Sequence, residues 1–405
     1  MIEIKTLSNK LKIAYERLPH ARSVSAGVWV LSGSRYEKIS GISHFIEHML
    51  FKGTKTKTAR EIAEKMDMTG GQLNAYTTRE YTSYYALTVD KSLDEALEVL
   101  SDMVINSRFS ESDIELEKGV VLEEIAMYED SPEDLVYDLL EEHAFSGNTL
   151  GRSITGSRES VMRITRNDIL SHMEAFYAPS NMVLSVAGNF NEDELLYFAE
   201  KYFGDMKDSS AVKPEYTKPL FTGGENTTVK EIEQANLAIG YESFGYDNDL
   251  RYPLIILNNA FGSSMSSRLF QRIREEEGLA YSVYSSVASY RDIGLFSIYA
   301  GLKAENLEKT EKIIREETEK LVKSGLTEEE ILRAKKQIAG SLILSGESVS
   351  SHMSTMGKGI LLNGKARSED ELIEKVEAVT DKDIIFVAEK VFGDGNCFRE
   401  IVRGK

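Results

Sequence analysis

The sequence is poor in cysteine, in proline and in long apolar runs. Among its 405 residues Cys397 is the only cysteine, so no disulfide can form within the chain and a disulfide-rich scaffold is excluded. Six prolines leave little room for a chain dominated by linkers. No segment approaches the roughly 20 apolar residues of a membrane span, and the first residues show no apolar core of a signal peptide. We therefore expect a cytoplasmic protein without a membrane partner.

Basic charge is scarce as well. The chain has 48 Lys and Arg residues against 66 Asp and Glu residues, which gives a formal net charge of −18. Nucleic-acid binding usually requires a basic face, so a nucleic-acid partner is not expected. An acidic chamber would attract basic peptides, although a generally solvated acidic surface explains the same charge balance.

The length of the chain predicts two domains. A single core rarely grows beyond about 250–300 residues. The segment over residues 209–228 contains two prolines, two glycines and several small polar residues, and it is the best candidate for a linker. We predict an N-terminal domain over residues 1–212, a linker over 213–228 and a C-terminal domain over 229–405.

The order of sequence patterns is similar in the two halves. In the first half, period-two alternation predicts strands over residues 10–18 and 23–33, followed by helices over 41–53 and 58–70, a strand pair over 73–89, and helices over 92–105 and 111–129. The second half repeats this order with a strand over 236–245, a helix over 252–264, a strand pair over 281–302, and helices over 305–325 and 327–348. We therefore expect an α+β fold of two homologous domains of about 200 residues, each a mainly antiparallel sheet packed against helices. Two unrelated α+β domains would look alike at this level.

The helix predicted over residues 41–53 carries the motif HFIEH. It is apolar around most of its circumference and should be buried, yet it contains His44, Glu47 and His48. Residues three and four apart share one face of a helix, so a zinc ion would satisfy both imidazoles and leave Glu47 beside its open position. A carboxylate there can act as general base on a water molecule. Two core histidines bonded to neighbours are the alternative explanation.

A zinc site of this type needs a third ligand, and Glu124 is the candidate. It lies seven residues after Glu117 on the helix predicted over 111–129, so the two carboxylates share a face, and Val120 and Val121 lie between them. An acidic helix with a solvated face explains this periodicity equally well.

Several segments in the same order resemble the pitrilysin/insulinase zinc metallopeptidases (inverzincins). The resemblance is greatest to their short bacterial members, which are similar to mitochondrial processing peptidase. The segments span nearly the whole chain and are SGISHFIEHMLFKGT, GGQLNAYTTREYTSYYA, LEKGVVLEEI, LGRSITG, FYAPSNMVLSVAGNF and SSRLFQRIREEEGLAYSVYSS. The resemblance implies that His44, His48 and Glu124 bind one zinc ion per chain and that Glu47 is the catalytic base. It also implies that Glu117 supports catalysis without binding the metal, as a carboxylate that orients a ligand.

The resemblance also assigns substrate-binding residues. Asn74 and Ala75 match an edge strand that grips an extended peptide by main-chain hydrogen bonds. Arg274 and Tyr281 match a pair that contacts the substrate near the scissile bond, where a guanidinium suits carbonyl oxygens and a phenol suits an oxyanion. From the residues alone, an ordinary surface strand, a salt-bridged arginine and a packed tyrosine are the simpler interpretation.

The resemblance further implies a homodimer. Longer family members join two such chains into a closing chamber, so Arg274 and Tyr281 of one subunit are expected to face the zinc of the other. Pairing with a related, non-identical chain stays open. The chain departs from the short members at FGSSMSSRLF, residues 261–270, where they often carry a glycine-rich stretch.

The leading functional hypothesis is a zinc endopeptidase that hydrolyses oligopeptides or unfolded, presequence-like segments inside a clamshell chamber. A non-catalytic peptide-binding or structural subunit is the alternative, and an amidohydrolase of small molecules is a third possibility. The intact set of His44, Glu47, His48 and Glu124 favours the enzyme. The order of metal affinities alone does not select zinc over manganese or cobalt.

Overall fold

Two sheets organise the chain, one in each of two compact units. The structure is a computed structural model that describes residues 2–208, 212 and 214–405. Unit 1 comprises Met1–Ile125, Arg152–Tyr216 and Leu344–Ser368. Unit 2 comprises Ala126–Gly151, Thr217–Ile343 and Glu369–Lys405. Each unit therefore combines segments from both halves of the sequence.

Sheet 1 has six strands in the order β1-β2-β6-β3-β5-β4. The strands are β1 (Glu3–Thr6), β2 (Lys12–Arg17), β3 (Ser23–Val30), β4 (Gln72–Thr77), β5 (Thr82–Val89) and β6 (Met182–Gly188). Only β2 and β6 pair in parallel. The central strand β3 is buried along almost its whole length, as expected for a strand covered on both faces. The edge strand β4 is exposed or half-buried throughout.

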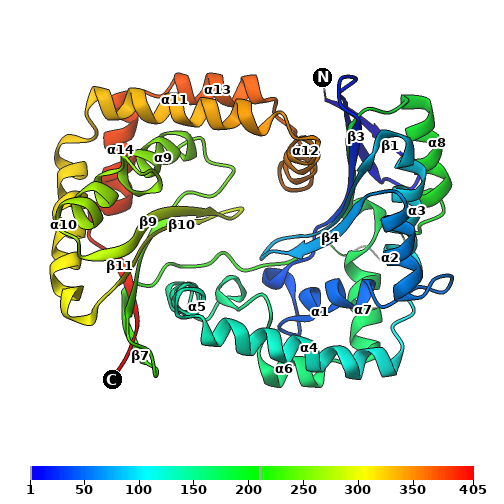
Figure 1. The fold of residues 1–405 in the computed structure, drawn as a ribbon, viewed down its shortest axis with the longest axis horizontal. Coiled ribbons are helices and arrows are strands. Elements are labelled where there is room, and N and C mark those ends of the chain that lie inside the picture. Colours follow the sequence, from blue (N-terminus) through cyan, green and yellow to red (C-terminus); the bar gives the residue numbers. More distant parts are fainter. Residues whose placement is uncertain (1, 209–211, 213) are drawn as a thin grey trace. The chain divides into compact units, whose positions relative to one another are not determined.

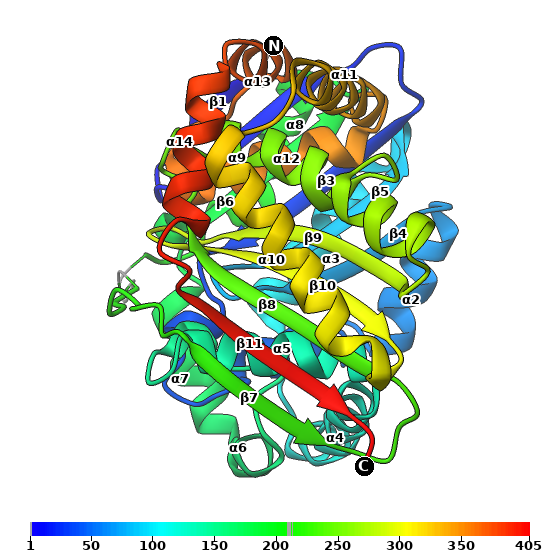
Figure 2. The ribbon, with the colours of Figure 1, turned by 90° about the vertical axis from the view of Figure 1, so that its left-hand side faces the viewer.

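Sheet 2 has five strands in the order β7-β11-β8-β10-β9, which lie side by side in Figure 2. The strands are β7 (Gly224–Val229), β8 (Ala235–Ser243), β9 (Ala280–Ser289), β10 (Gly294–Leu302) and β11 (Cys397–Arg403). Only β7 and β11 pair in parallel. If β1 is set aside, the five strands of each half are arranged identically: first, fifth, second, fourth and third in chain order. This shared topology supports one duplicated fold.

Helices cover both sheets (Figure 1). From the first half of the chain they are α1 (Ile42–Leu50), α2 (Ala59–Met68), α3 (Leu93–Asn106), α4 (Glu111–Asp130), α5 (Pro132–Ala144), α6 (Arg158–Arg163), α7 (Arg166–Phe176) and α8 (Glu192–Phe203). From the second half they are α9 (Arg251–Asn258), α10 (Leu307–Ser324), α11 (Glu328–Ser345), α12 (Val349–Asn363), α13 (Glu369–Glu377) and α14 (Asp381–Phe392), with π-helical turns η5 (Asn259–Ser263) and η6 (Phe270–Glu276). The predicted α+β fold of two related sheets packed against helices is confirmed.

Each unit contains one helix from the opposite half of the sequence. Helix α5, from the first half, packs on β8 and β11 of sheet 2, whereas α12, from the second half, packs on β3 and β6 of sheet 1. The approach of α12 is close: a Cβ atom on Gly357 would lie 2.1 Å from Nε1 of Trp29. The Trp29 ring is fully buried and donates from Nε1 to Oγ of Ser185 at 2.8 Å, so it cannot move aside easily. Glycine is therefore required at position 357 for α12 to pack against β3 and β6 of sheet 1.

The predicted domain ranges of 1–212 and 229–405 stay a prediction. The two compact units are built from segments that are interleaved along the chain. Residue 213, the first of the predicted linker, lies outside the described residues. Residues 214–223 form no helix or strand, and β7 occupies the end of the predicted linker.

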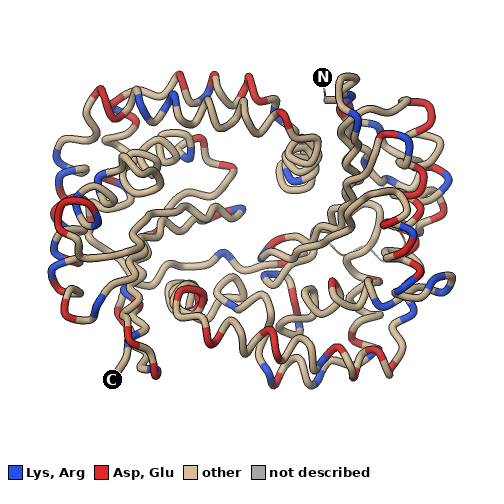
Figure 3. Tube along the Cα trace, viewed as in Figure 1, with Lys and Arg blue, Asp and Glu red and all other residues tan. Residues whose placement is uncertain are grey.

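Charged residues of both signs are interspersed along the helices (Figure 3). This mixture suits a solvated surface. Within the described part of the chain, no helix combines the length and the apolar composition needed to cross a bilayer.

Gly357→Ala should destabilise the protein by about 1–3 kcal/mol, because the added methyl group overpacks the contact between α12 and Trp29. Urea unfolding followed by circular dichroism measures the change. Gly340→Ala is the matched control: Gly340 also lies inside a helix, but nothing approaches its Cβ position within 4 Å, so this change should leave stability equal or higher. Equal stability of wild type and Gly357→Ala would contradict the close packing of α12.

Candidate metal centre

Helix α1 is held at its N-terminus by a buried carboxylate. Oxygens of Glu37 accept hydrogen bonds from the backbone N–H groups of Gly41 and Ser43, both at 2.8 Å. Such a carboxylate satisfies free N–H groups at a helix start. Burial raises the pKa of Glu37 to about 7, and the hydrogen bonds from Ser43 and Gly41 limit this rise. The start of α1 is therefore fixed by an acceptor outside the helix.

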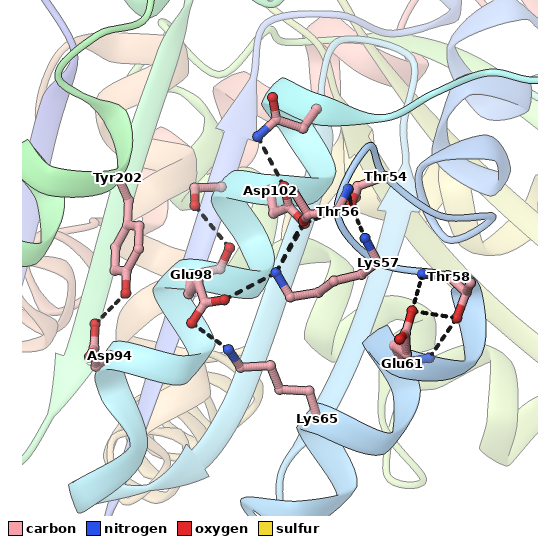
Figure 4. Close-up of polar contacts among 12 residues, drawn as sticks. Thr54, Thr56, Lys57, Thr58, Glu61, Lys65, Asp94, Glu98, Asp102 and Tyr202 are labelled. Carbon is pink, nitrogen blue, oxygen red and sulfur yellow. Dashed lines mark hydrogen bonds and ion pairs between the residues drawn. The ribbon is translucent and has the colours of Figure 1, made fainter.

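The loop after α1 is anchored to α3 (Figure 4). Gly53 has a φ of 114° just beyond the helix, a conformation that favours glycine. Asp102 of α3 then accepts hydrogen bonds from Thr54 at 2.7 Å and from Thr56 at 2.8 Å, and it forms an ion pair with Lys57 at 3.2 Å. Both ends of α1 are thus tied to the scaffold of unit 1.

Helices α1 and α4 bring His44, His48 and Glu124 together. Nε2 of His44 lies 3.5 Å from Oε1 of Glu124, and Nε2 of His48 lies 3.2 Å from Oε2 of the same residue. The ligand atoms of the three side chains all lie within 4.8 Å of one another. No other group of three or more histidine, cysteine or acidic residues has this spacing among the described residues.

These distances fit a zinc ion. Zinc ligand atoms lie about 2.0–2.2 Å from the metal, so neighbouring atoms of a tetrahedral site are about 3.3–3.6 Å apart. The two separations of 3.5 Å and 3.2 Å are close to this value. Two imidazoles and one carboxylate are also a donor set that zinc accepts while a fourth position stays open.

Glu117 orients one of the candidate ligands. Its Oε1 lies 2.9 Å from Nδ1 of His48, and its Oε2 lies 2.5 Å from Nζ of Lys52. A bond at Nδ1 leaves Nε2 of His48 directed at Glu124. Glu117 is almost fully buried, so the lysine ammonium provides the opposite charge that a buried carboxylate needs. Lys52 was not recognised from the sequence, although it lies one turn beyond His48.

The carboxylates of Glu117 and Glu124 stabilise the protonated form of His48. Burial by itself lowers the pKa of His48, but hydrogen bonds to Glu117 and Glu124 outweigh burial and raise that pKa to about 9. His44 and His48 hold the pKa of Glu124 well below its usual range. In the absence of a metal, a proton on His48 balances the carboxylates, and a divalent cation can take the place of that proton.

Glu47 lies between the two histidines in sequence and is not a member of the metal-ligand group. Its Oε2 accepts a hydrogen bond of 2.5 Å from Oγ1 of Thr77, at the end of β4. Thr77 was not predicted from the sequence as a site residue. The alternation of β4 could have indicated it, since Thr77 lies on the same strand face as Ala75.

The remaining predicted residues lie on edge strands or beside them. Asn74 and Ala75 are on β4, an outermost strand of sheet 1, where Oδ1 of Asn74 accepts from the backbone N–H of Ala75 at 2.8 Å. Arg274 lies in η6 and Tyr281 in β9, an outermost strand of sheet 2. Cζ of Arg274 is 5.0 Å from the ring centroid of Tyr281, a residue that is 81% exposed. The structure therefore brings the Arg/Tyr pair together, while its role stays a prediction.

Comparison with known proteins places the chain in a family. Residues 12–158 match the model described as insulinase (peptidase family M16), and residues 163–338 match the model described as the peptidase M16 inactive domain. The chain belongs to the M16 peptidase family. The family assignment made from the sequence is confirmed.

Curated relatives of this M16 protein are named zinc proteases. An uncharacterized zinc protease of Bacillus subtilis is 44% identical over 394 residues, which are 97% of this chain and 96% of that protein. An uncharacterized zinc protease of Streptomyces coelicolor is 37% identical over 96% of this chain and 86% of that protein. The family and these names support a zinc protease at a general level.

Solved structures share the fold over the full length. A protease from Helicobacter pylori superimposes with a TM-score of 0.91 at 24% identity, covering 100% of this chain and 99% of that chain. A structure from Pseudomonas fluorescens, described as a peptidase M16 inactive domain, gives a TM-score of 0.93 at 17% identity, covering 100% and 98%. At these identities the two structures show the fold alone.

Glu117→Gln should weaken zinc binding by about 10–100-fold, because it removes the charged acceptor that orients His48. Competition with a fluorescent zinc chelator measures the affinity. Glu123→Gln, an exposed change on the same helix, should leave the affinity unchanged. If both variants bind zinc as tightly as the wild type does, Glu117 does not support the site.

Proposed function

We propose that this M16 protein is a zinc-dependent endopeptidase. The observation that carries the proposal is the convergence of His44, His48 and Glu124, with Glu47 on the same helix turn but outside the ligand group. His44, His48 and Glu124 would hold one zinc ion per chain. A bound zinc ion supplies Lewis-acid polarisation of a peptide carbonyl and lowers the pKa of a water molecule to roughly 7.

Glu47 acts as the general base in this proposal. One oxygen, Oε2, is held by Thr77, which leaves Oε1 to take the proton of the attacking water and to pass it to the leaving amine. Because Thr77 ends β4, the carboxylate is positioned by the same strand that would hold the substrate. Glu117 fixes the ring of His48 and thereby the direction of one metal ligand.

The substrate would be an extended peptide added to the free edge of β4 beside Asn74 and Ala75. Main-chain pairing reads the backbone and accepts varied side chains, which suits oligopeptides and unfolded, presequence-like segments. The net charge of −18 supports a preference for basic peptides. The cytoplasmic location expected from the sequence stays a prediction.

The substrate site is completed by a second subunit in this proposal. Arg274 and Tyr281 of the partner subunit would contact the peptide inside a closed chamber. The exposure of Tyr281 and its contact with the half-buried Arg274 support an intermolecular role. The alternative function is a non-catalytic peptide-binding subunit, and it draws on the inactive-domain description that matches residues 163–338.

Glu47→Gln should keep about one zinc ion per chain, because Glu47 is not a ligand, and should lower peptide cleavage by about 10²–10⁴-fold. Metal analysis and cleavage of a mixed peptide library, followed by mass spectrometry, measure both properties. Glu64→Gln, an exposed glutamate of α2, serves as the control and should retain activity. A wild type that binds zinc but cleaves no peptide would favour the non-catalytic alternative.

Mixing Glu47→Gln with Arg274→Ala should restore activity if the site is shared between subunits. Each variant alone is expected to be inactive or nearly so. Statistical exchange makes half of the dimers hybrid, each with one intact site, so about a quarter of wild-type activity should return. Native mass spectrometry verifies the exchange. Hybrid dimers that form without any gain in activity would rule out shared sites.

A further inference from the structure

Corresponding positions of the two sheets differ in polarity. In sheet 1, Ile13 of β2 pairs with Leu184 of β6, and both are fully buried in the core of unit 1. In sheet 2, the same places in the parallel pair β7 and β11 hold Glu225 and Arg399. The registers correspond, because in both pairs the first residue of the six-residue strand meets the second residue of the seven-residue strand. An apolar pair of unit 1 is therefore replaced by a charged pair in unit 2.

Helix α10 extends this difference. Its fifth residue is Glu311, whereas the fifth residue of α3, which occupies the same place in the order of elements, is the fully buried Leu97. Glu311 forms an ion pair with Nε of Arg399, and Nη1 of Arg399 lies 3.2 Å from Glu225. The region that aliphatic side chains fill in unit 1 is a cavity of about 820 Å³ in unit 2.

The cavity has an apolar floor. Ile239 and Tyr241 of β8, Ile314 of α10 and Phe392 of α14 line it, and all four are buried. Figure 2 shows α10 in front of sheet 2 with α14 beside it, and these elements all belong to unit 2. A volume of this size with an apolar floor and a few polar groups is typical of a site for a small ligand.

One end of the cavity is negatively charged. At the N-terminal end of α10, Glu308 adds a third carboxylate to those of Glu225 and Glu311. The guanidinium of Arg399 balances only one of these three charges. This end therefore favours a positively charged group of a ligand.

A cation follows in the middle of the cavity. Arg315 lies seven residues after Glu308 on the same helix, which corresponds to about 10 Å at 1.5 Å per residue. Within the described part of the chain Arg315 forms no ion pair. Its charge acts on Tyr241 and Cys397, which share a hydrogen bond on the floor. An unpaired guanidinium next to an apolar surface suits a carboxylate that is attached to an apolar group.

We propose that this cavity binds a short peptide with free termini and an apolar C-terminal side chain. The ammonium group meets the acidic end, and the terminal carboxylate meets Arg315. Three extended residues span about 10 Å, which matches the separation of Glu308 and Arg315 along α10. The C-terminal side chain covers Tyr241 and Phe392. This inference does not depend on the proposed peptidase function.

Calorimetric titration of the full-length, zinc-loaded Glu47→Gln chain with the tripeptide Ala-Ala-Phe tests the proposal, because the peptide cannot be hydrolysed at the proposed site of this variant. A dissociation constant of about 10 µM to 1 mM is expected for a ligand of this size. N-acetylation removes the ammonium group and C-amidation removes the carboxylate, so each should weaken binding by about 10-fold. Equal binding of the three forms, tighter binding of either modified form, or no binding up to about 10 mM would overturn the proposal.

Cys397 reports where the peptide binds. It is the only cysteine of the sequence, and it lies half-buried in the cavity. Saturating Ala-Ala-Phe should slow the alkylation of Cys397 by iodoacetamide several-fold, as measured by mass spectrometry. Because burial raises the pKa of this thiol, the reaction is run at about pH 9, where more thiolate is present. Binding that leaves the alkylation rate unchanged would place the peptide elsewhere and contradict the assignment.

Variants assign the two ends of the ligand. Arg315→Gln should weaken binding of Ala-Ala-Phe by about 10-fold but should not weaken binding of the amidated peptide, which has no carboxylate to lose. Glu308→Gln should show the same pattern with the acetylated peptide. Lys312→Gln, an exposed change on α10 at a residue that pairs with Glu316, is the control and should leave every affinity unchanged. An Arg315→Gln chain that binds all forms as the parent does, or loses all of them equally, would refute the role of Arg315.

Discussion

Polar side chains on a buried helix must find partners, and this requirement shapes the site and its surroundings. Helix α1 is buried along most of its length, yet it carries two imidazoles and one carboxylate. Each would cost several kcal/mol if left without a partner. The partners come from other elements: Glu117 and Glu124 from α4, and Thr77 from β4. The polar residues of α1 therefore lock a helix, a second helix and an edge strand into one arrangement.

The second half of the chain keeps this scaffold and changes its chemistry. The corresponding segment, α9 and η5, has no copy of the HFIEH motif. Asn258 occupies the end of α9, and its Oδ1 accepts a 2.7 Å hydrogen bond from Ser285 on the edge strand β9. The link from helix to edge strand is thus retained with a neutral amide and a hydroxyl group. Because no buried charge remains in that link, neither an acidic helix nor a cation is needed to balance it.

The sequence was sufficient where local patterns determine the outcome. The strands and helices that were predicted in the two halves occur in the predicted order, because period-two alternation and helix caps such as the Thr58–Glu61 capping box are local signals. The structure brings Glu124 close to His44 and His48. Helical spacing alone put Glu117 and Glu124 on one face but left a solvated acidic helix equally open, and the assignment of Glu124 as a ligand came from the family resemblance. The catalytic and ligand roles of these residues stay predictions.

Other features depend on contacts between distant segments and leave no local signal. The packing of α5 and α12 on the sheet of the opposite sequence half is an example, because both helices have ordinary amphipathic sequences. The positions of Lys52 and Thr77 are others, since a lysine after a helix and a threonine in a strand are common on surfaces. The requirement for glycine at position 357 is visible only from its contact with Trp29, because a side chain at position 357 would collide with the Trp29 ring.

An exposed strand edge is normally a hazard, because it can pair with any other edge. Strand β4 is short, with six residues, and so spans only about 20 Å at 3.4 Å per residue. A peptide must be extended and free of its own hydrogen bonds to use that edge fully, which selects unfolded segments before any side chain is read. Since Thr77 ends the same strand and holds Glu47, a peptide that pairs along β4 is aligned with the proposed base by the pairing itself. Under the proposed function, backbone recognition and the placement of the reacting bond are then one event.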